Sequence, residues 1–263
     1  MIPIKSPKEI DRMRESGRRA AEIIGQLSRL VSPGVSTGEI DSAAAALMAD
    51  LGCSSAFLGY RGFPGHICIS LNEEVVHGIG GKRRIQYGDI VKLDVGVFYQ
   101  GYVGDTATTV AAGAIDSKIQ RLLEVTEDAL YLAIKQAIPG NWVGDISSAV
   151  EDEIVANGFS VVREFVGHGV GKKLHEEPQV PNFGKPKSGA RLKPGMTLAI
   201  EPMVNMGTSA VKILADGWTV VTADKRHSSH FEHTVLITQG EPEILTKRER
   251  VMVKPDPQNV IAT

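Results

Sequence analysis

Apolar residues recur at helical spacing near the start of the chain and predict two helices. The first follows Ser6-Pro7-Lys8-Glu9, which combines a capping box with a proline at the first helical position. Its apolar positions are Ile10, Met13, Ala20, Ile24, Leu27 and Val31. This spacing is typical of an amphipathic helix. Pro33-Gly34 ends it, and Ser36-Thr37-Gly38-Glu39 caps a second helix that ends at Gly52.

The same pattern returns in the second half of the chain. PGVSTGEIDSA at 33–43 aligns with PGNWVGDISSA at 139–149, an offset of 106, and Gly52 falls on Gly158. The apolar positions before the second copy are Ile119, Leu122, Leu123, Leu130 and Ile134. They predict a long helix like the first, so each half is expected to hold two helices joined by a Pro-Gly turn.

The predicted strands repeat as well. GDIVKLD at 88–94 and GMTLAIE at 195–201 both run from a glycine through five residues to a carboxylate. After each comes a second strand that opens with an acid, DTATTV at Asp105 and EHTVLIT at Glu232. A duplicated αα-ββ unit predicts an α+β fold, with two antiparallel sheet halves related by a pseudo-twofold axis and helices covering one face. The four acids are expected to meet near that axis.

Composition narrows the class of protein. The chain has 263 residues, of which 42% are hydrophobic and 23% charged, as is typical of a globular protein. Its net charge is −2, so the composition gives no indication of a basic, nucleic-acid-binding surface. No apolar run approaches the ~18 residues of a membrane span, and the N-terminus lacks the apolar stretch of a signal peptide. Cys53 and Cys68 form no disulfide framework or metal-binding spacing, which favours a reducing, cytoplasmic compartment. We expect one catalytic domain over 1–263, with halves of about 1–112 and 113–250 and a polar tail at 247–263.

The first two acids are predicted to face each other. If Tyr99-Gln100 forms a tight turn, Phe98 pairs with Gly101 and Asp94 lies opposite Asp105. Directly opposed side chains have Cβ atoms roughly 4.5–5.5 Å apart, where like charges are destabilising unless water or a cation separates them. For an isolated hairpin, two solvated aspartates would be the simpler interpretation.

The repeat favours a metal site instead. Glu201 and Glu232 occupy the equivalent places in the second half, and Glu201 ends an apolar strand that is expected to be buried. Four converging buried carboxylates repel one another, and a dinuclear metal site would neutralise them. In FVGHGVGKKLHEEP at 165–178, His168 lies between two glycines and can complete an oxygen-rich site. His175 is then expected either behind the ligands or facing the substrate.

Five motifs together resemble the type I methionine aminopeptidases. They are GDIVKLDVGVFYQGYVGDTATT, GHGVGKKLHEEPQV, LKPGMTLAIEPMV, DGWTV and FEHTVLIT. The resemblance runs from Ile4 to about Leu245, and the 33 residues between His168 and Glu201 are similar to the short gap of the type I form. It implies the pita-bread fold of this family, a curved antiparallel sheet covered by helices, which agrees with the repeat.

The resemblance also implies roles for individual residues. The implied metal ligands are Asp94, Asp105, His168, Glu201 and Glu232, holding two divalent ions, which can be Co, Mn, Fe or Zn. The implied catalytic residues are His77, His175 and Glu201. A metal-bridged hydroxide would attack the scissile carbonyl, Glu201 would carry the proton, His175 would hydrogen-bond the carbonyl oxygen, and His77 would contact the amide. The implied methionine pocket consists of Tyr60, Phe63, Cys68 and Trp218. The resemblance to some relatives further implies a monovalent cation near Asn72 and Ser228.

The implied activity is removal of the initiator methionine from nascent proteins and peptides with a small second residue. Partners would be nascent N-termini, Met-peptides and, transiently, the ribosome; we expect a cytoplasmic monomer without a membrane or nucleic-acid partner. Arg61 and Phe63 stand where relatives often have histidine and tyrosine, and Leu174 where they often have phenylalanine. Two alternatives are an Xaa-Pro aminopeptidase or prolidase, which carries a further N-terminal domain, and a non-catalytic pita-bread binding protein.

Overall fold

The computed structural model describes residues 1–248 and confirms the predicted α+β plan. Elements of the first half are α1 (Pro7–Leu30), α2 (Thr37–Asp50), β1 (Ser54–Ser55), the 3₁₀ turn η1 (Tyr60–Gly62), β2 (Cys68–Leu71), β3 (Glu74–Val76), β4 (Ile90–Tyr99) and β5 (Tyr102–Ala111). Those of the second half are α3 (Ser117–Lys135), α4 (Val143–Ala156), β6 (Ser160–Val161), β7 (Gly167–Gly169), β8 (Glu176–Val180), β9 (Thr197–Ile200), β10 (Met203–Asn205), β11 (Val211–Ile213), β12 (Val220–Thr222), β13 (Ser228–His230), β14 (His233–Leu236) and β15 (Glu243–Ile244).

The helix starts follow the predicted capping. The carboxylate of Glu9 accepts hydrogen bonds from the backbone N–H and the hydroxyl of Ser6, both at 2.9 Å. At α2 the box is reciprocal, because Glu39 accepts from the backbone of Ser36 at 2.8 Å while the Ser36 hydroxyl accepts from the Glu39 N–H at 3.2 Å. These bonds satisfy amide donors that the first helical turn leaves unpaired.

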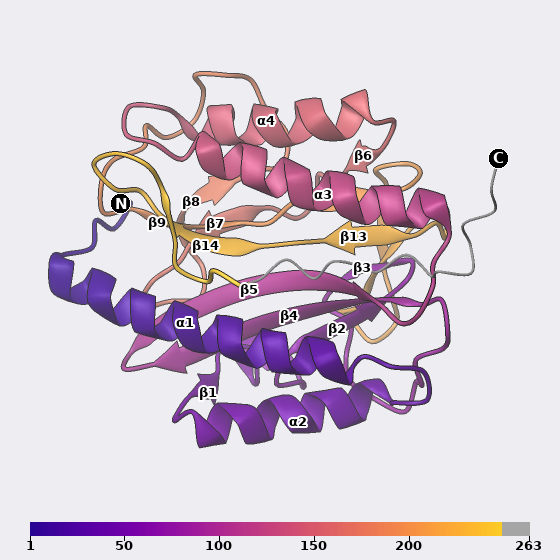
Figure 1. The fold of residues 1–263 in the computed structure, drawn as a ribbon. Helices are drawn as coiled ribbons and strands as arrows, with labels where there is room; N and C mark the ends of the chain where they lie inside the picture. The colour runs from indigo at the N-terminus through magenta and orange to yellow at the C-terminus, as the bar shows by residue number, and fades with distance from the viewer. Residues whose placement is uncertain (249–263) are drawn as a thin grey trace, which may run out of the picture.

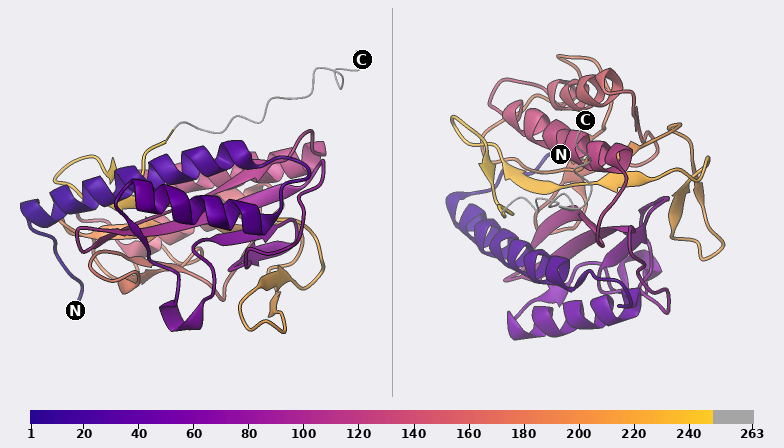
Figure 2. Two further views of the ribbon diagram at one scale, coloured as in Figure 1. Left: turned by 90° about the horizontal axis from the view of Figure 1, so that it is seen from below. Right: turned by 45° about the vertical axis from the view of Figure 1, so that its right-hand side comes forward.

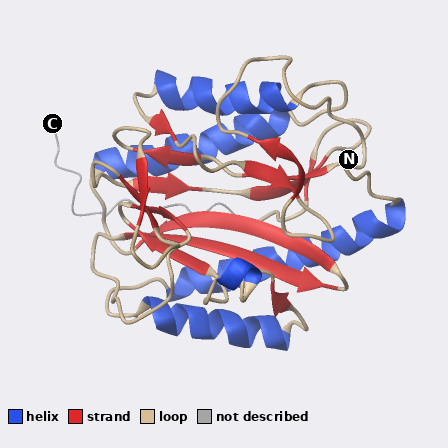
Figure 3. Ribbon diagram, turned by 180° about the vertical axis from the view of Figure 1, so that it is seen from behind, coloured by secondary structure: helices blue, strands red, loops and turns tan. Residues whose placement is uncertain are grey.

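All strand pairs in the described residues are antiparallel. In the first half, β4 pairs with β1, β2 and β5, and in the second half a five-stranded sheet runs β15-β14-β9-β7-β8. Two three-stranded sheets, β13-β10-β6 and β11-β12-β3, flank them. The four long helices lie on one side of the strands, as Figure 1 and the view from below in Figure 2 show. From behind, the strands and η1 face the viewer and the helices lie beyond them (Figure 3).

The predicted turn of the β4–β5 hairpin is wrong by one residue. The turn residues are Gln100 and Gly101, with φ of 48° and 80°, so Tyr99 pairs with Tyr102. Positive φ at both positions gives the turn whose twist matches that of the strands, and glycine accepts it readily. Asp94 therefore pairs with Ala107 rather than with Asp105, whose partner is Gly96.

The prediction that the acids lie at strand ends is confirmed in the second half of the chain and wrong in the first. Asp94 and Asp105 lie inside the ten-residue strands β4 and β5, whereas Glu201 directly follows β9 and Glu232 directly precedes β14. Because the hairpin register moved by two residues, both aspartates still point to the same face, as diagonal neighbours. The expected convergence therefore survives the error.

The two halves join along β5 and the segment leading into β14. The Thr106 hydroxyl donates to the carbonyl of Glu232 at 2.9 Å, and the Glu232 N–H donates to the carbonyl of Ala107 at 2.9 Å. Arg248 donates to the same Ala107 oxygen at 2.6 Å, so the first part of the predicted polar tail is anchored here. Residues 249–263 of that tail lie outside the described residues. Within the described part, no helix is long and apolar enough to cross a membrane.

Candidate metal centre and substrate pocket

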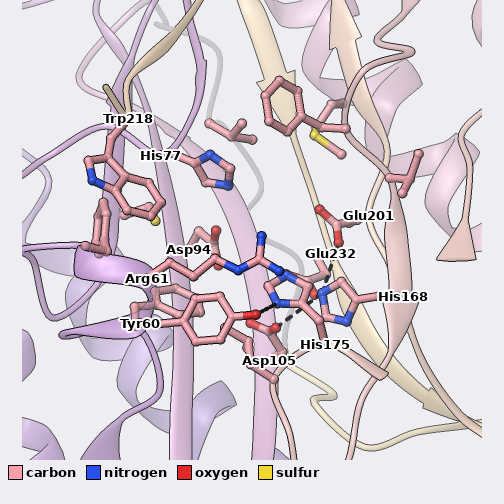
Figure 4. A pocket seen from close by; sticks show the side chains of 18 of the residues that line it. Tyr60, Arg61, His77, Asp94, Asp105, His168, His175, Glu201, Trp218 and Glu232 are labelled. Carbon is pink, nitrogen blue, oxygen red and sulfur yellow. Dashed lines mark hydrogen bonds and ion pairs between the residues drawn. The ribbon is translucent and has the colours of Figure 1, made fainter. Parts of the chain in front are cut away.

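Every residue predicted to bind the metal, to bind the substrate or to act in catalysis lines one cavity of about 290 Å³. Tyr60 and Arg61 of η1 line it (Figure 4), and η1 lies on the strand face away from the long helices (Figure 3). The predicted residues in its wall are Tyr60, Phe63, Cys68, His77, Asp94, Asp105, His168, His175, Glu201, Trp218 and Glu232. They come from both halves of the chain, so the fold brings together positions up to about 170 residues apart.

The acids and His168 meet on the floor of this cavity. Ligand atoms of Asp105, His168 and Glu232 all lie within 4.8 Å of one another. His168 Nε2 is 3.4 Å from Glu201 Oε1 and 3.9 Å from Asp105 Oδ2. Asp94 reaches the same cavity from β4. A single ion of ordinary coordination distance can therefore contact several of these groups at once.

Burial disfavours the charged form of every acid in the cluster. Desolvation raises the pKa of Asp94 to about 7 and that of Glu201 to about 8. It raises the pKa of Asp105 and Glu232 well above their ordinary values, and the neighbouring carboxylates add to the rise. A cation among them would reverse this cost, because it stabilises the ionised carboxylates.

One backbone oxygen fixes the tautomer of His168. Its Nδ1 lies 2.8 Å from the carbonyl oxygen of Gly169, which can only accept a hydrogen bond. Burial lowers the pKa of His168 to about 3, so the ring is neutral and Nδ1 carries its one proton. Nε2 therefore presents a lone pair to Asp105 and Glu201, as a metal-binding histidine does.

Several buried polar atoms at this floor have no hydrogen-bond partner among the described residues. They are Asp94 Oδ1, Asp105 Oδ1, Glu232 Oε1 and His230 Nε2. Buried polar atoms are normally paired, and four orphans in one cluster indicate that another group completes it. Carboxylate oxygens with one imidazole suit a divalent ion, so the residues fit such a metal.

The glycines beside His168 were expected to let this residue approach the ligands closely, but in the structure they serve strand packing. A Cβ on Gly167 would lie 2.4 Å from the carbonyl oxygen of Ala199, and one on Gly169 would lie 2.2 Å from that of Glu177. Strand β7 is thus held tightly between β9 and β8.

His77 and His175 also line the cavity, and each contacts aromatic rings. His175 Nδ1 is 2.8 Å from the Tyr60 hydroxyl, and its ring centroid lies 4.2 Å from that of His168. His77, at a positive φ of 60°, packs edge-on against Trp218 and Phe165. Burial lowers the pKa of both imidazoles, that of His77 to about 4. Figure 4 shows His77 beside Trp218 and, apart from it, His175 beside Tyr60 and His168.

The apolar part of the cavity contains the predicted pocket and residues that were missed. Phe63 and Trp218 meet edge-to-face with ring centroids 5.2 Å apart, and Cys68 pairs in register with Asp94. The unpredicted lining residues include Phe57, Val76, Phe165 and Met203. They belong to ordinary apolar runs, so only their position in the fold distinguishes them from other core residues.

His230 is the polar residue that sequence reasoning missed. It is 1% exposed, and its Nε2 lies 3.7 Å from Glu201 Oε2. Burial lowers its pKa to about 4, although nearby Asp94 acts in the opposite direction. Its position two residues before Glu232, on the same side of an extended segment, was the available signal.

The two positions proposed for a monovalent cation face a side chain of the protein itself. Nζ of Lys92 donates to the backbone carbonyls of Asn72 at 2.8 Å and Ser228 at 2.9 Å. An ammonium group thus lies where the added ion was expected.

The fold and the cavity define a class: an α+β protein in which two halves of the chain enclose a carboxylate–histidine cluster suited to a metal, beside an apolar pocket. Residues 11–239 match the family Peptidase_M24, described as metallopeptidase family M24. The chain belongs to this family. Its members share the pita-bread fold, which confirms the predicted architecture.

Individual relatives cover almost the whole chain. Methionine aminopeptidase 1 of Bacillus subtilis is 49% identical over 247 residues, which is 94% of this chain and 100% of the relative. A methionine aminopeptidase structure from Thermotoga maritima is 44% identical with a TM-score of 0.93, covering 94% of this chain and 100% of that one. A prolidase structure from Pyrococcus horikoshii is 25% identical with a TM-score of 0.77, and the match covers 95% of this chain but 65% of the prolidase.

Proposed function

We propose that this chain is a metal-dependent aminopeptidase that removes N-terminal methionine from proteins and peptides with a small second residue. The observation that carries the proposal is an apolar pocket, with aromatic and thiol walls, opening directly onto the carboxylate–histidine floor. A methionine side chain suits such walls, because its thioether contacts aromatic rings favourably. The names of the Bacillus and Thermotoga relatives agree with this substrate.

Asp94, Asp105, His168, Glu201 and Glu232 would hold two divalent ions, which can be Co, Mn, Fe or Zn. When bound, the metal supplies Lewis-acid chemistry and an acidified water. Four carboxylates, each with two oxygen atoms, and one imidazole supply enough ligand atoms for two ions.

The chain's own groups move the protons and orient the peptide. Glu201, placed at the end of β9 with one oxygen near His168 and the other near His230, takes the proton of the attacking water and passes it to the leaving amine. The Nε2–H of His175 donates to the carbonyl oxygen as negative charge develops there, while Tyr60 holds Nδ1. His77 faces the same space from the opposite wall and contacts the peptide backbone.

The second residue of the substrate must pass between these histidines and the acids. Rings and carboxylates surround this passage, so small residues such as Gly, Ala or Ser are favoured and bulky ones displace the scissile bond. The substrates would be nascent chains and Met-peptides, with transient ribosome contact, for a monomeric enzyme in the cytoplasm acting as one catalytic domain.

A prolidase-like activity is the second candidate, because the Pyrococcus prolidase shares the fold. The discriminating assay compares Met-Ala-Ser with an Ala-Pro peptide, using protein that has been chelated and then reloaded with each metal. We expect hydrolysis of the first peptide only, abolished by chelation. Preferred cleavage of Ala-Pro would assign the prolidase activity, and binding without cleavage of either would assign a non-catalytic role.

A further inference from the structure

Lys92 is a fully buried lysine whose amine contacts backbone oxygens and no carboxylate among the described residues. It lies in β4 and is 1% exposed. Its Nζ donates to the carbonyls of Asn72 and Ser228 at 2.8 and 2.9 Å. Lysine is almost never fully buried without a partner ion, so this arrangement needs a specific explanation.

The two carbonyls form a built site. Asn72 has a positive φ of 51°, and its side chain is held by Asp89, which accepts from Nδ2 at 2.8 Å, and by the N–H of Ile90, which donates to Oδ1 at 3.0 Å. The Asn72 carbonyl also accepts the N–H of Ser228 at 2.9 Å. The site therefore joins the first half of the chain to the second at a defined backbone geometry.

Converging carbonyl oxygens are what a desolvated monovalent cation requires, because they replace its hydration shell. A lysine ammonium is a compact cation of single charge with three donors. The ammonium group of Lys92 reaches the two carbonyl oxygens from β4, so these oxygens are hydrogen-bonded without an ion from solution.

The site is connected along the chain to catalytic groups from both halves of the protein. Asn72 leads into β3 and then His77, while Ser228 opens the segment β13 that leads to His230 and Glu232. Lys92 itself precedes Asp94 by two residues and points to the same side of β4. A shift of either carbonyl would thus be passed to residues on both walls of the cavity.

We propose that the Lys92 ammonium is a built-in monovalent cation, a positioning group that fixes the two carbonyls and makes the enzyme independent of Na⁺ and K⁺. Carbonyl oxygens can only accept hydrogen bonds, so the two bonds from Nζ are those that an ammonium group makes.

The first test uses the unaltered, metal-loaded, full-length chain. Thermal unfolding is followed while NaCl or KCl replaces tetramethylammonium chloride at constant ionic strength. We expect the same Tm in all three salts. A saturable rise in Tm with Na⁺ or K⁺ would show that the protein binds a separate ion and would overturn the proposal. This readout does not depend on the proposed peptidase function.

The second test removes the ammonium in two ways. Lys92→Ala leaves space at the carbonyls, whereas Lys92→Met fills the space without a charge. Both are expected to lower Tm by roughly 5 °C, because buried acceptors lose their donor. Only Lys92→Ala should recover with Na⁺ or K⁺, saturably, with KM for a Met-peptide improving in parallel.

Lys5 supplies the matched control. It is also buried, at 7% exposed, but pairs conventionally with Glu176 at 2.7 Å. Lys5→Ala should lose stability without any ion-specific recovery. Equal recovery of the Lys5 and Lys92 variants, or a Lys92→Ala variant with unchanged Tm and kinetics, would contradict the proposal. If Lys92→Ala does not fold, the first test still decides.

Discussion

Glu201 is the residue on which the proposed chemistry depends most. It directly follows a buried strand, faces His168 with one oxygen and His230 with the other, and has its pKa raised to about 8 by burial. With cations bound among the acids, the ionised form of Glu201 is stabilised, so the carboxylate is available to accept a proton from the attacking water. Ligation and proton transfer would then be combined in one side chain.

Glu201→Gln is expected to abolish turnover of a Met-peptide, since an amide can neither accept the proton nor supply a charged ligand. The measurement is kcat at saturating metal, with bound metal quantified separately. Glu164→Gln is the matched control, because Glu164 is an exposed acid that lines the same cavity. Comparable losses in the two variants would argue against a specific role for Glu201.

His175→Ala is expected to lower kcat/KM by ~10²–10³, the usual cost of losing one donor to a developing oxyanion. Metal content should be unchanged, because the ring contacts His168 without belonging to the orphaned cluster. Tyr60→Phe, which removes only the hydroxyl at Nδ1, should cost less. Near-normal turnover by His175→Ala would remove this histidine from the mechanism.

At the scale of elements, α1 and the β4–β5 hairpin determine how the aspartates are presented. The Ser16 hydroxyl of α1 donates to the Tyr102 carbonyl at 3.0 Å, and Gly104 of β5 lies directly under the helix. A Cβ on Gly104 would be 2.5 Å from the backbone of Ser16, which cannot move aside without the helix. Asp105 is the next residue along this strand.

Gly104→Ala is therefore expected to lower the free energy of unfolding by ~1–3 kcal/mol, the typical cost of overpacking. Denaturant unfolding of the metal-loaded protein measures it. Gly25→Ala is the control: Gly25 lies in α1, the helix that covers Gly104, and a Cβ there would have nothing within 4 Å. This variant should be neutral or stabilising by up to ~1 kcal/mol. If the Gly104 variant were as stable as the Gly25 variant, the close contact between Gly104 and the backbone of Ser16 would be refuted.

Sequence patterns predicted these elements to different degrees. Capping residues and the duplicated Pro-Gly phrase placed the helices correctly, because those signals are local. The hairpin turn was misplaced by one residue, because the position of the turn depends on a left-handed conformation at Gln100 as well as at Gly101. Lys92 gave no signal, because nothing in VKLD distinguishes a buried lysine facing carbonyls from an edge lysine facing water.

At the scale of the whole molecule, the acids are assembled by joining two half-sheets. Hydrogen bonds from Thr106 and to Ala107 hold Glu232 against β5, so each half depends on the other for a complete cluster. The repeat and the apolar strand before Glu201 predicted this meeting and its burial, but not the participation of His230. That participation follows from tertiary packing, which the sequence pattern does not specify.

The chelated protein is expected to lose stability as pH rises. Folded-state pKa values of Asp94 and Glu201 are raised to about 7 and about 8, above unfolded values near ~4. Such groups contribute stability below the unfolded pKa and lose it as pH rises through the folded pKa. The buried histidines His77, His168 and His230 act in the opposite direction below ~6.5, because their folded pKa values are lowered to about 4, 3 and 4. The net fall in the free energy of unfolding is therefore expected between about pH 6.5 and 8.

Denaturant titrations across this range test the trend, with the metal-loaded protein as the comparison. Bound cations should remove most of the fall, and Glu201→Gln should reduce it in the chelated chain. A chelated protein whose stability is flat or rises over the same window would contradict the buried, mutually repelling cluster.

The most direct test of the account is anomalous X-ray diffraction from crystals of the protein loaded with Mn²⁺ or Co²⁺ and soaked with methionine. Metal peaks are predicted among Asp94, Asp105, His168, Glu201 and Glu232, at roughly 2.0–2.2 Å from their oxygen and nitrogen atoms. The methionine sulfur is predicted between Phe63, Cys68 and Trp218. Metal bound away from these five side chains, or methionine outside this pocket, would contradict the proposed site and with it the proposed function.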